Sequence, residues 1–273
     1  MKTRMCLIAM LILVTGLFAT GCVTNPATKE KELIFLSSDQ EIALGKEAAP
    51  QFEKEFDGKV ENEALQQYVR SVGAKLAAAS DRLMPYEYTL LASKVPNAFA
   101  LPGGKVYVTA GLMKMMENER GLAAVLGHET GHIAALHNVK GLQRQMGAAV
   151  LVEIADYAMG AQVPDATKVT ELVSGIINLK YSRDDEYQAD QFGILYMTRA
   201  GYNPWGMVEL LTALDSLDKS NPGLFDEMFM THPLTPKRIE EARTTVQGQY
   251  PTAVRTAPDV AAPHFLQMKA LLK

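Results

Sequence analysis

The segment 122–136 places two histidines and one glutamate on a helix with almost no other polar side chain. At 100° per residue its larger apolar side chains form one sector, and side chains no larger than alanine form a second. The first sector comprises Leu122, Val125, Leu126, Ile133 and Leu136, and the second Ala123, Ala124, Gly127, Gly131, Ala134 and Ala135. We therefore expect this helix to be buried, with another element packed closely against its small residues.

His128 and His132 lie side by side on this helix, because four residues make about one turn. Burying two imidazoles and a carboxylate costs several kcal/mol unless something satisfies them. Histidines at i and i+4 can both aim a nitrogen at one zinc ion, at about 2.0–2.1 Å. The spacing therefore predicts one zinc ion per chain, held by both histidines. The alternative is a pair of hydrogen-bonded core histidines with an incidental glutamate.

Glu129 follows the first histidine and is rotated away from the axis of the metal. Zinc with three protein ligands keeps a position open for a water, whose pKa it lowers to about 7. We expect Glu129 to accept the proton of that water and to hand it to the leaving amine of a peptide. His137 points to nearly the opposite side of the helix, which predicts a structural or surface histidine.

The third protein ligand is expected to be a carboxylate, because no further histidine follows at the short spacing of a three-histidine motif. Residues 182–190 begin a helix with an acidic cluster, in which Glu186 and Asp190 lie four residues apart on one face. One can bind the metal while the other fixes a ligand histidine through its free ring N–H. A solvated acidic first turn, favoured by the helix dipole, explains the same pattern.

The remaining periodicity predicts an α+β fold that is mainly helical and contains a small sheet. Helices are expected over about 38–56 and 62–79, and strands over 86–92, 97–101 and 106–109, the last two flanking the turn Pro102-Gly103-Gly104. From Leu112 onward the sequence predicts mostly helical structure, with breaks near 160–164, 201–204 and 220–223.

The composition, with 48% apolar and 21% charged residues, is that of a globular protein and excludes a disordered or fibrous one. Lysine and arginine number 27 and aspartate and glutamate 31, for a net charge of −4. That mild acidity argues against a nucleic-acid-binding protein, which normally shows a basic face.

The first 21 residues have the layout of a bacterial lipoprotein signal. Lys2 and Arg4 precede an uncharged apolar stretch over 7–20, and small residues come directly before Cys22. The stretch, at about 14 residues, is short for a membrane span of roughly 20, and no later stretch reaches 18 apolar residues. We expect cleavage before Cys22 and acylation of its sulfur. A simple secreted protein or an uncleaved anchor is the alternative.

Four motifs resemble the metallopeptidase family forty-eight, which includes HtpX, BepA and the prenyl-protein endopeptidases. They are Asn97-Ala-Phe-Ala-Leu-Pro-Gly-Gly104, His128-Glu-Thr-Gly-His132, Ser182-Arg-Asp-Asp-Glu-Tyr-Gln-Ala-Asp190 and Thr231-His-Pro233. The resemblance spans residues 38–246 and implies a zincin-like fold of the gluzincin type. It makes Glu186 the third zinc ligand and Asp190 its orienting partner.

The resemblance also implies how a substrate binds. The strand that contains Asn97, Ala98 and Phe99 is expected to pair with an extended polypeptide, so that backbone hydrogen bonds supply the affinity. His232 either stabilises a developing oxyanion or takes the fourth metal position and keeps the enzyme latent; a residue that only shapes the turn is the alternative. Arg238 is expected to pair with an acidic group nearby or to form a surface salt bridge.

Together these expectations describe a membrane-tethered zinc endopeptidase of the bacterial cell envelope. It faces the periplasm on the inner or outer membrane and cuts unfolded or extended envelope proteins, as the resemblance implies. The alternative is a non-proteolytic assembly factor or chaperone whose groove holds strands around a structural or regulatory zinc. The expected parts are a signal over 1–21, a tether over 22–38, the metallopeptidase domain over 39–248 and a C-terminal extension over 249–273.

Overall fold

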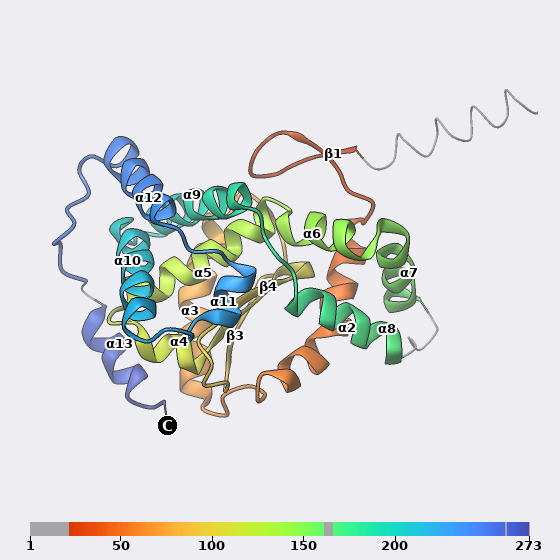
Figure 1. The fold of residues 1–273 in the computed structure, drawn as a ribbon, viewed down its shortest axis with the longest axis horizontal. Helices are drawn as coiled ribbons and strands as arrows, with labels where there is room; N and C mark the ends of the chain where they lie inside the picture. The colour runs from red at the N-terminus through yellow and green to blue at the C-terminus, as the bar shows by residue number, and fades with distance from the viewer. Residues whose placement is uncertain (1–21, 161–165, 260, 273) are drawn as a thin grey trace, which may run out of the picture.

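The computed structural model describes residues 22–160, 166–259 and 261–272 (Figure 1). In the first half the elements are β1 (Cys22–Thr24), β2 (Lys31–Leu33), α2 (Ser38–Glu55), α3 (Glu63–Ala79), β3 (Glu87–Leu91), β4 (Ala98–Leu101), the short 3₁₀ helix η1 (Pro102–Gly104), β5 (Lys105–Thr109), α4 (Ala110–Met115) and α5 (Glu119–Ala134). The second half is helical, with α6 (His137–Met146), α7 (Ala148–Met159), α8 (Ala166–Ile177), α9 (Arg183–Arg199), α10 (Trp205–Ser220), α11 (Asp226–Thr231), α12 (Pro236–Gln249) and α13 (Ala262–Lys269). The predicted α+β, mainly helical fold is confirmed.

Local side-chain chemistry sets where these helices begin. Ser37 and Gln40 form a reciprocal capping box at the start of α2, and Ser182 and Asp185 form another at the start of α9. The side chain of Asn118 accepts a hydrogen bond from the backbone N–H of Gly121 and so caps α5. Each of these caps pairs a polar side chain with a backbone N–H that has no partner within the helix, and so fixes where the helix begins.

The central sheet has three strands in the order β3-β5-β4, with β3 parallel and β4 antiparallel to β5. The turn between β4 and β5 uses Gly103 at φ 77°, a left-handed conformation that glycine adopts without strain. Strand β4 is an edge strand, and no other strand in the described part of the chain pairs with its outer side. The predicted hairpin is therefore present, with one backbone edge left unpaired by the sheet.

Both faces of the sheet are covered by helices (Figure 1). Ala98 and Ala100 of β4 pack into the cluster formed with α3 and α5. Phe99 and Leu101 alternate with them and pack against α2, where the rings of Phe99 and Phe52 meet edge to face at 5.1 Å. Because successive side chains of a strand point to opposite faces, one short strand contributes to both cores.

Helices α5 and α9 approach each other along glycines. A Cβ atom on Gly131 would lie 2.9 Å from the backbone oxygen of Ala189, and one on Gly127 would lie 3.3 Å from the oxygen of Gly193. Gly193 in turn faces the backbone nitrogen of His128, 3.1 Å from the position of a Cβ. The predicted close approach to the sector of small residues is confirmed, and α9 is the partner.

Helix α5 ends earlier than its apolar periodicity predicts. It stops at Ala134, and Leu136 has the left-handed φ of 62° that redirects the chain into α6. The expectation that His137 lies on the opposite side of the same helix is therefore wrong, because the helical geometry does not extend that far. His137 is instead buried, as the first residue of α6.

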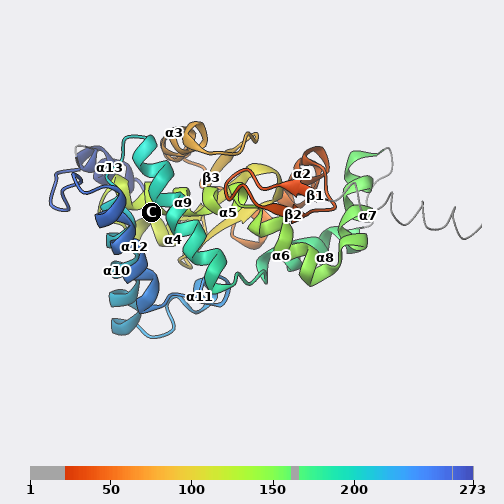
Figure 2. The same ribbon diagram turned by 90° about the horizontal axis from the view of Figure 1, so that it is seen from above.

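The segment expected to be a tether, residues 22–38, packs against the domain. Strands β1 and β2 pair antiparallel (Figure 2). The buried side chain of Asn25 donates a hydrogen bond to the oxygen of Ala135 at 2.8 Å. Ile34 and Leu36 are buried in the core. These two buried side chains alternate with the exposed Leu33 and Phe35, as in an extended chain. Their burial outweighs the polar composition of the segment.

The C-terminal residues also return to the body of the protein. Helix α13 contacts α3, and its Phe265 is completely buried. The extension expected over 249–273 thus contributes to the core along part of its length. The predicted signal over 1–21 lies outside the described residues. Among the residues that are described, no helix combines the length and the apolar character needed to cross a membrane.

We expect Gly131→Ala to destabilise the protein by about 1–3 kcal/mol, because the added methyl group meets the backbone of α9. Gly248→Ala in α12 is the matched control, since its Cβ would meet no atom within 4 Å. That control is expected to be neutral or to stabilise by about 0.4–1 kcal/mol. Urea unfolding of both variants measures the difference, and equal stabilities would contradict the tight α5–α9 packing.

Candidate metal centre

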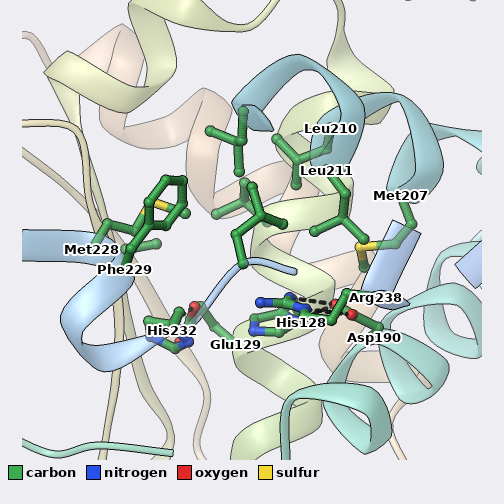
Figure 3. Close-up of a pocket in the computed structure, with 14 residues that line it drawn as sticks. His128, Glu129, Asp190, Met207, Leu210, Leu211, Met228, Phe229, His232 and Arg238 are labelled. Atoms are coloured by element: carbon green, nitrogen blue, oxygen red, sulfur yellow. Dashed lines mark hydrogen bonds and ion pairs between the residues drawn. The ribbon is translucent and has the colours of Figure 1, made fainter. Parts of the chain in front are cut away.

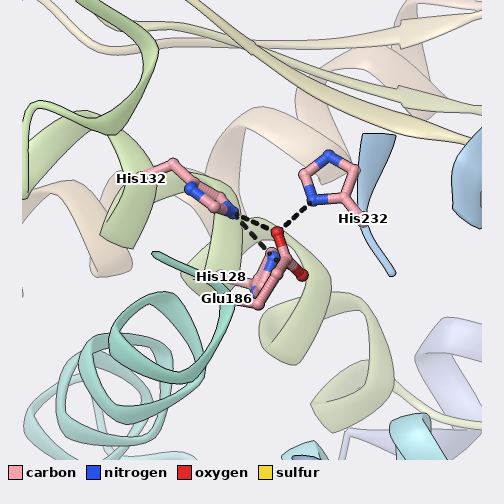
Figure 4. A group of neighbouring side chains, drawn as sticks. All are labelled: His128, His132, Glu186 and His232. Atoms are coloured by element: carbon pink, nitrogen blue, oxygen red, sulfur yellow. Dashed lines mark hydrogen bonds and ion pairs between the residues drawn. The ribbon is translucent and has the colours of Figure 1, made fainter. Parts of the chain in front are cut away.

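Three separate parts of the chain bring four possible metal ligands to one point (Figure 4). Helix α5 supplies His128 and His132, α9 supplies Glu186, and His232 directly follows α11. Each side chain is buried, and one ligand atom from each lies within 4.8 Å of those of the other three. The structure thus brings together the three residues expected as metal ligands and adds His232 to the group.

The ring nitrogens of the α5 histidines converge. The Nε2 atoms of His128 and His132 are 3.0 Å apart, and Glu186 Oε1 lies 3.2 Å from Nε2 of His132. His128 Nδ1 is 2.9 Å from Asp190 Oδ1, so Nδ1 carries the hydrogen that it donates to the carboxylate. In the neutral ring the Nε2 lone pair then points to the centre of the group.

The charges around this point fit a divalent cation. Glu129, Glu186 and Asp190 are three buried carboxylates, and Arg238 is one buried guanidinium, which leaves a formal charge of −2. Imidazole nitrogens and a carboxylate oxygen are also the ligand set that zinc takes in proteins. Both the charge balance and the chemistry of the donors therefore fit a metal ion held by these side chains.

Glu129 lies beside the cluster and outside the ligand group. Its carboxylate is buried, and Oε2 has no hydrogen-bond partner in the described part of the structure. Burial raises the pKa of this carboxyl group, an effect that the nearby His232 and His128 oppose. An unpartnered buried carboxylate oxygen is costly, so it indicates a group that acts on something bound in the site.

Arg238 holds two carboxylates of α9 in place, and Figure 3 shows its contact with one of them, Asp190. Its Nε and Nη2 atoms each donate to Asp190 at 2.8 Å, and Nη1 lies 2.5 Å from Glu186 Oε2. Although burial alone raises the pKa of each carboxyl group, the guanidinium holds the pKa of both below the ordinary value. The salt bridge of Arg238 is buried, so the alternative of a surface salt bridge is wrong.

His232 is buried inside the cluster. Its Nδ1 atom is 3.0 Å from Glu186 Oε1, and its Nε2 atom is 3.9 Å from Glu129 Oε1. Burial lowers the pKa of the imidazole, but Glu186 and Glu129 outweigh that effect and the pKa is raised. A role limited to shaping the turn does not account for these contacts with two carboxylates.

The sequence reasoning missed two residues that surround His132. The ring of Tyr181 stacks on that of His132, with centroids 3.9 Å apart and planes 24° apart. On its other side, His132 Nδ1 lies 3.0 Å from His137 Nδ1. Tyr181 directly precedes the acidic cluster of 182–190, and this position was the one sequence signal that could have placed it near the site. No pattern in the sequence indicated the left-handed conformation of Leu136, which brings His137 to His132.

An apolar pocket opens next to the cluster (Figure 3). His128, Glu129 and His232 form its polar end, and Ala98 of β4 belongs to its wall. The other apolar side chains come mainly from α5, α10 and α11: Val125, Met207, Leu210, Leu211, Leu214, Met228, Phe229 and Leu234. A mainly apolar wall therefore lies directly beside Glu129.

The expected substrate strand has free backbone groups next to this pocket. Thr109 N donates to Asn97 O at 3.0 Å, and the antiparallel alternation then turns the backbone groups of Ala98 and Ala100 away from β5. The Asn97 side chain accepts the Ala98 N–H at 2.9 Å. The described hydrogen bonds leave three backbone groups unpaired along the outer edge of β4: the C=O of Ala98 and the N–H and C=O of Ala100. Phe99 is held in the core.

Glu186→Ala is expected to lower the metal content of the purified protein at least about ten-fold, because one of the converging ligands is removed. Asp184→Ala is the matched control: this carboxylate lies two residues away on the same helix and is exposed. Elemental analysis of both variants after identical purification gives the result, and unchanged metal in Glu186→Ala would mean that another carboxylate is the ligand.

Comparison with known proteins gives matches over most of the chain. It is 27% identical over 282 residues to the beta-barrel assembly-enhancing protease of Yersinia pestis, covering 95% of this chain and 56% of that protein. Metalloprotease YcaL of Escherichia coli (strain K12) is 33% identical over 167 residues, covering 59% of this chain and 63% of YcaL. The mitochondrial metalloendopeptidase OMA1 of Schizosaccharomyces pombe is 32% identical over 177 residues, covering 64% and 51%.

The chain spans about half the length of the assembly-enhancing proteases that it matches, between 47% and 56% of each. The family described as "Peptidase family M48" matches residues 62–246, which include the three α5 side chains, the α9 carboxylates and His232. This range is more than half of the 273 residues and contains every side chain of the candidate metal centre. The chain therefore belongs to peptidase family M48.

Proposed function

We propose that the protein is a zinc-dependent endopeptidase that cuts extended polypeptides. The observation that carries this proposal is the position of Glu129: a buried carboxylate oxygen without a partner in the described structure lies beside four converging metal ligands. A purely structural metal site has no use for such a group, whereas hydrolysis needs a base at that place.

His128, His132 and Glu186 are the residues that would hold the ion. Zinc bound by three protein ligands supplies Lewis acidity, which acidifies water and polarises a carbonyl oxygen. Asp190 keeps the His128 ring in the orientation that directs Nε2 inward, and Arg238 keeps Asp190 in place through two hydrogen bonds. Pairing with Arg238 also leaves Glu186 ionised, as a metal ligand must be.

Glu129 acts as general base and then as general acid. Its free Oε2 atom can accept a proton from the attacking water, and the buried surroundings that raise its pKa suit both steps of the transfer. The proton then passes to the nitrogen of the leaving amine. Glu129 directly follows His128 on helix α5, so its carboxylate lies close to the potential metal ligands without being one of them.

His232 is proposed to stabilise the oxyanion of the tetrahedral intermediate. As an imidazolium, which donates through both ring nitrogens, it donates Nδ1–H to Glu186 and turns Nε2–H towards the Glu129 side of the cluster, where the reacting carbonyl must lie. The same ring also lies within the group of potential metal ligands, so a latent state in which it binds the metal competes with this role.

The substrate is proposed to add a strand to the outer edge of β4. The free backbone groups of Ala98 and Ala100 offer hydrogen bonds to an extended chain, and they lead to the apolar pocket beside Glu129. Backbone pairing selects for unfolded or extended segments and depends little on their sequence. The apolar pocket favours cleavage next to an apolar side chain.

We further propose that the protein works at the bacterial cell envelope, facing the periplasm, tethered to the inner or outer membrane by a lipid on Cys22. Cys22 is exposed at the start of β1. The three relatives named above are a beta-barrel assembly-enhancing protease, a metalloprotease and a mitochondrial metalloendopeptidase. Misfolded envelope proteins are the proposed substrates.

Glu129→Gln is expected to bind metal as the wild type does but to cleave unfolded casein about 10²–10⁴-fold more slowly, since the general base is lost. Glu55→Gln, the same change at an exposed site, is the control and should leave the rate unchanged. If Glu129→Gln cleaves like the wild type, the non-proteolytic strand-holding function becomes the better explanation.

His232→Ala separates the two roles of this histidine. Loss of an oxyanion-stabilising group should lower kcat by about 10²–10³-fold with metal content unchanged. Faster cleavage by the variant would instead show that His232 restrains the wild type as a metal ligand. Unchanged kinetics would contradict both roles and leave only the shaping of the turn.

Mass spectrometry of the protein isolated from bacterial membranes tests the tether. The expected mature chain begins at Cys22 and carries acyl groups on that residue. A chain that still contains residues 1–21, or one with an unmodified Cys22, would contradict lipidation while leaving the peptidase activity open to the casein assay.

A further inference from the structure

His132 and His137 face each other through the same type of ring nitrogen. Their Nδ1 atoms are 3.0 Å apart, and both side chains are completely buried. A hydrogen bond between two imidazole nitrogens needs a hydrogen on one of them and a lone pair on the other. Whichever ring donates, its partner's tautomer is fixed as well, because a neutral imidazole carries only one ring hydrogen.

The surroundings of His137 decide the direction of this bond. Its Nε2 atom lies 3.2 Å from Gln188 Oε1 and 3.6 Å from Asp185 Oδ1. Both are oxygen acceptors, and an ionised carboxylate can only accept. The hydrogen of a neutral His137 is therefore on Nε2, which leaves the lone pair on Nδ1.

We infer that His137 is a positioning residue for the metal centre: it accepts the Nδ1–H of His132 and thereby keeps the Nε2 lone pair of His132 directed at the metal. The inference rests on the proposed metal-dependent function and assigns a task to a residue outside the ligand group. If the direction were reversed, His132 would carry its hydrogen on Nε2, the atom that lies 3.2 Å from Glu186 Oε1, and could not bind a cation there.

This arrangement gives each α5 histidine its own anchor on α9. His128 Nδ1 is held directly by Asp190 at 2.9 Å. His132 is too far along α5 for the same contact, and His137 bridges the distance to Gln188. A single helix thus supplies a metal ligand, Glu186, and the anchors that orient both ligand histidines.

The end of α5 is what makes the bridge possible. Leu136 adopts φ 62°, a conformation that is strained for a bulky residue, and turns the chain so that His137 returns towards His132. Tyr181 stacks against the other side of the His132 ring and limits its rotation. The ring is consequently fixed in its plane by stacking and in its tautomer by His137.

Three variants test this role by metal affinity, which does not depend on catalysis. His137→Leu removes the acceptor and is expected to weaken binding of Co²⁺ and Zn²⁺ by about 10–100-fold in a chelator competition. His137→Asn places an oxygen where Nδ1 stood, so it should recover most of the wild-type affinity. His264→Leu, at an exposed histidine, is the control and should bind as the wild type does.

Spectroscopy distinguishes positioning from a general loss of packing. In the zinc-loaded wild type, ¹⁵N NMR is expected to show His132 protonated at Nδ1 and metal-bound through Nε2. The absorption spectrum of the Co²⁺ form should change in His137→Leu and return in His137→Asn, while urea unfolding of the metal-free variants reports their stability separately.

Equal metal affinities for the Leu and Asn variants would overturn the inference, as would binding of the metal through His132 Nδ1. Either result would leave the proposed peptidase intact, because that function is tested by casein cleavage and Glu129→Gln. A wild-type protein that binds neither Co²⁺ nor Zn²⁺ would overturn both.

Discussion

The contact between α5 and α9 is the interaction on which the site depends. Gly127, Gly131 and Gly193 remove the side chains that would otherwise separate the two helices. Only at this separation can a carboxylate on α9 reach the nitrogens of two histidines on α5. The small residues of the buried helix therefore matter as much to the chemistry as the histidines do, because they determine which second helix can approach and how closely. The face of α5 that carries these glycines therefore determines both how the two helices pack and where the potential ligands lie.

Charge balance is the second constraint. Three buried carboxylates surround the cluster, and Arg238 compensates for only one of them. In a medium of low dielectric constant such an excess is unfavourable, and a divalent cation removes it. Arg238 also divides the carboxylates by task. Glu186 and Asp190 are paired with the guanidinium and remain ionised, whereas Glu129 keeps a free oxygen and a raised pKa. The proposed ligand, orienting group and base are all carboxylates, and they differ in their surroundings.

Local features of the site could be predicted from the sequence, and features that depend on distant contacts could not. His128, Glu129 and His132 share one helix, so their relation follows from helical spacing. The choice of Glu186 over Asp190 as the ligand depended on a family resemblance, because spacing alone treats them alike. The burial of Arg238 and the stacking of Tyr181 result from how α12 and the segment before α9 fold back onto the cluster. His137 was misplaced because Leu136 carries no sequence signal for the left-handed conformation that ends α5.

The metal content of the purified protein, measured together with its activity, shows most directly whether a bound cation is needed for this site to work. We predict about one zinc ion per chain, loss of casein cleavage when a chelator removes the ion, and recovery of cleavage when zinc is added back. A protein that contains no transition metal, yet is folded and cleaves casein at the same rate before and after chelation, would rule out a metal-dependent peptidase.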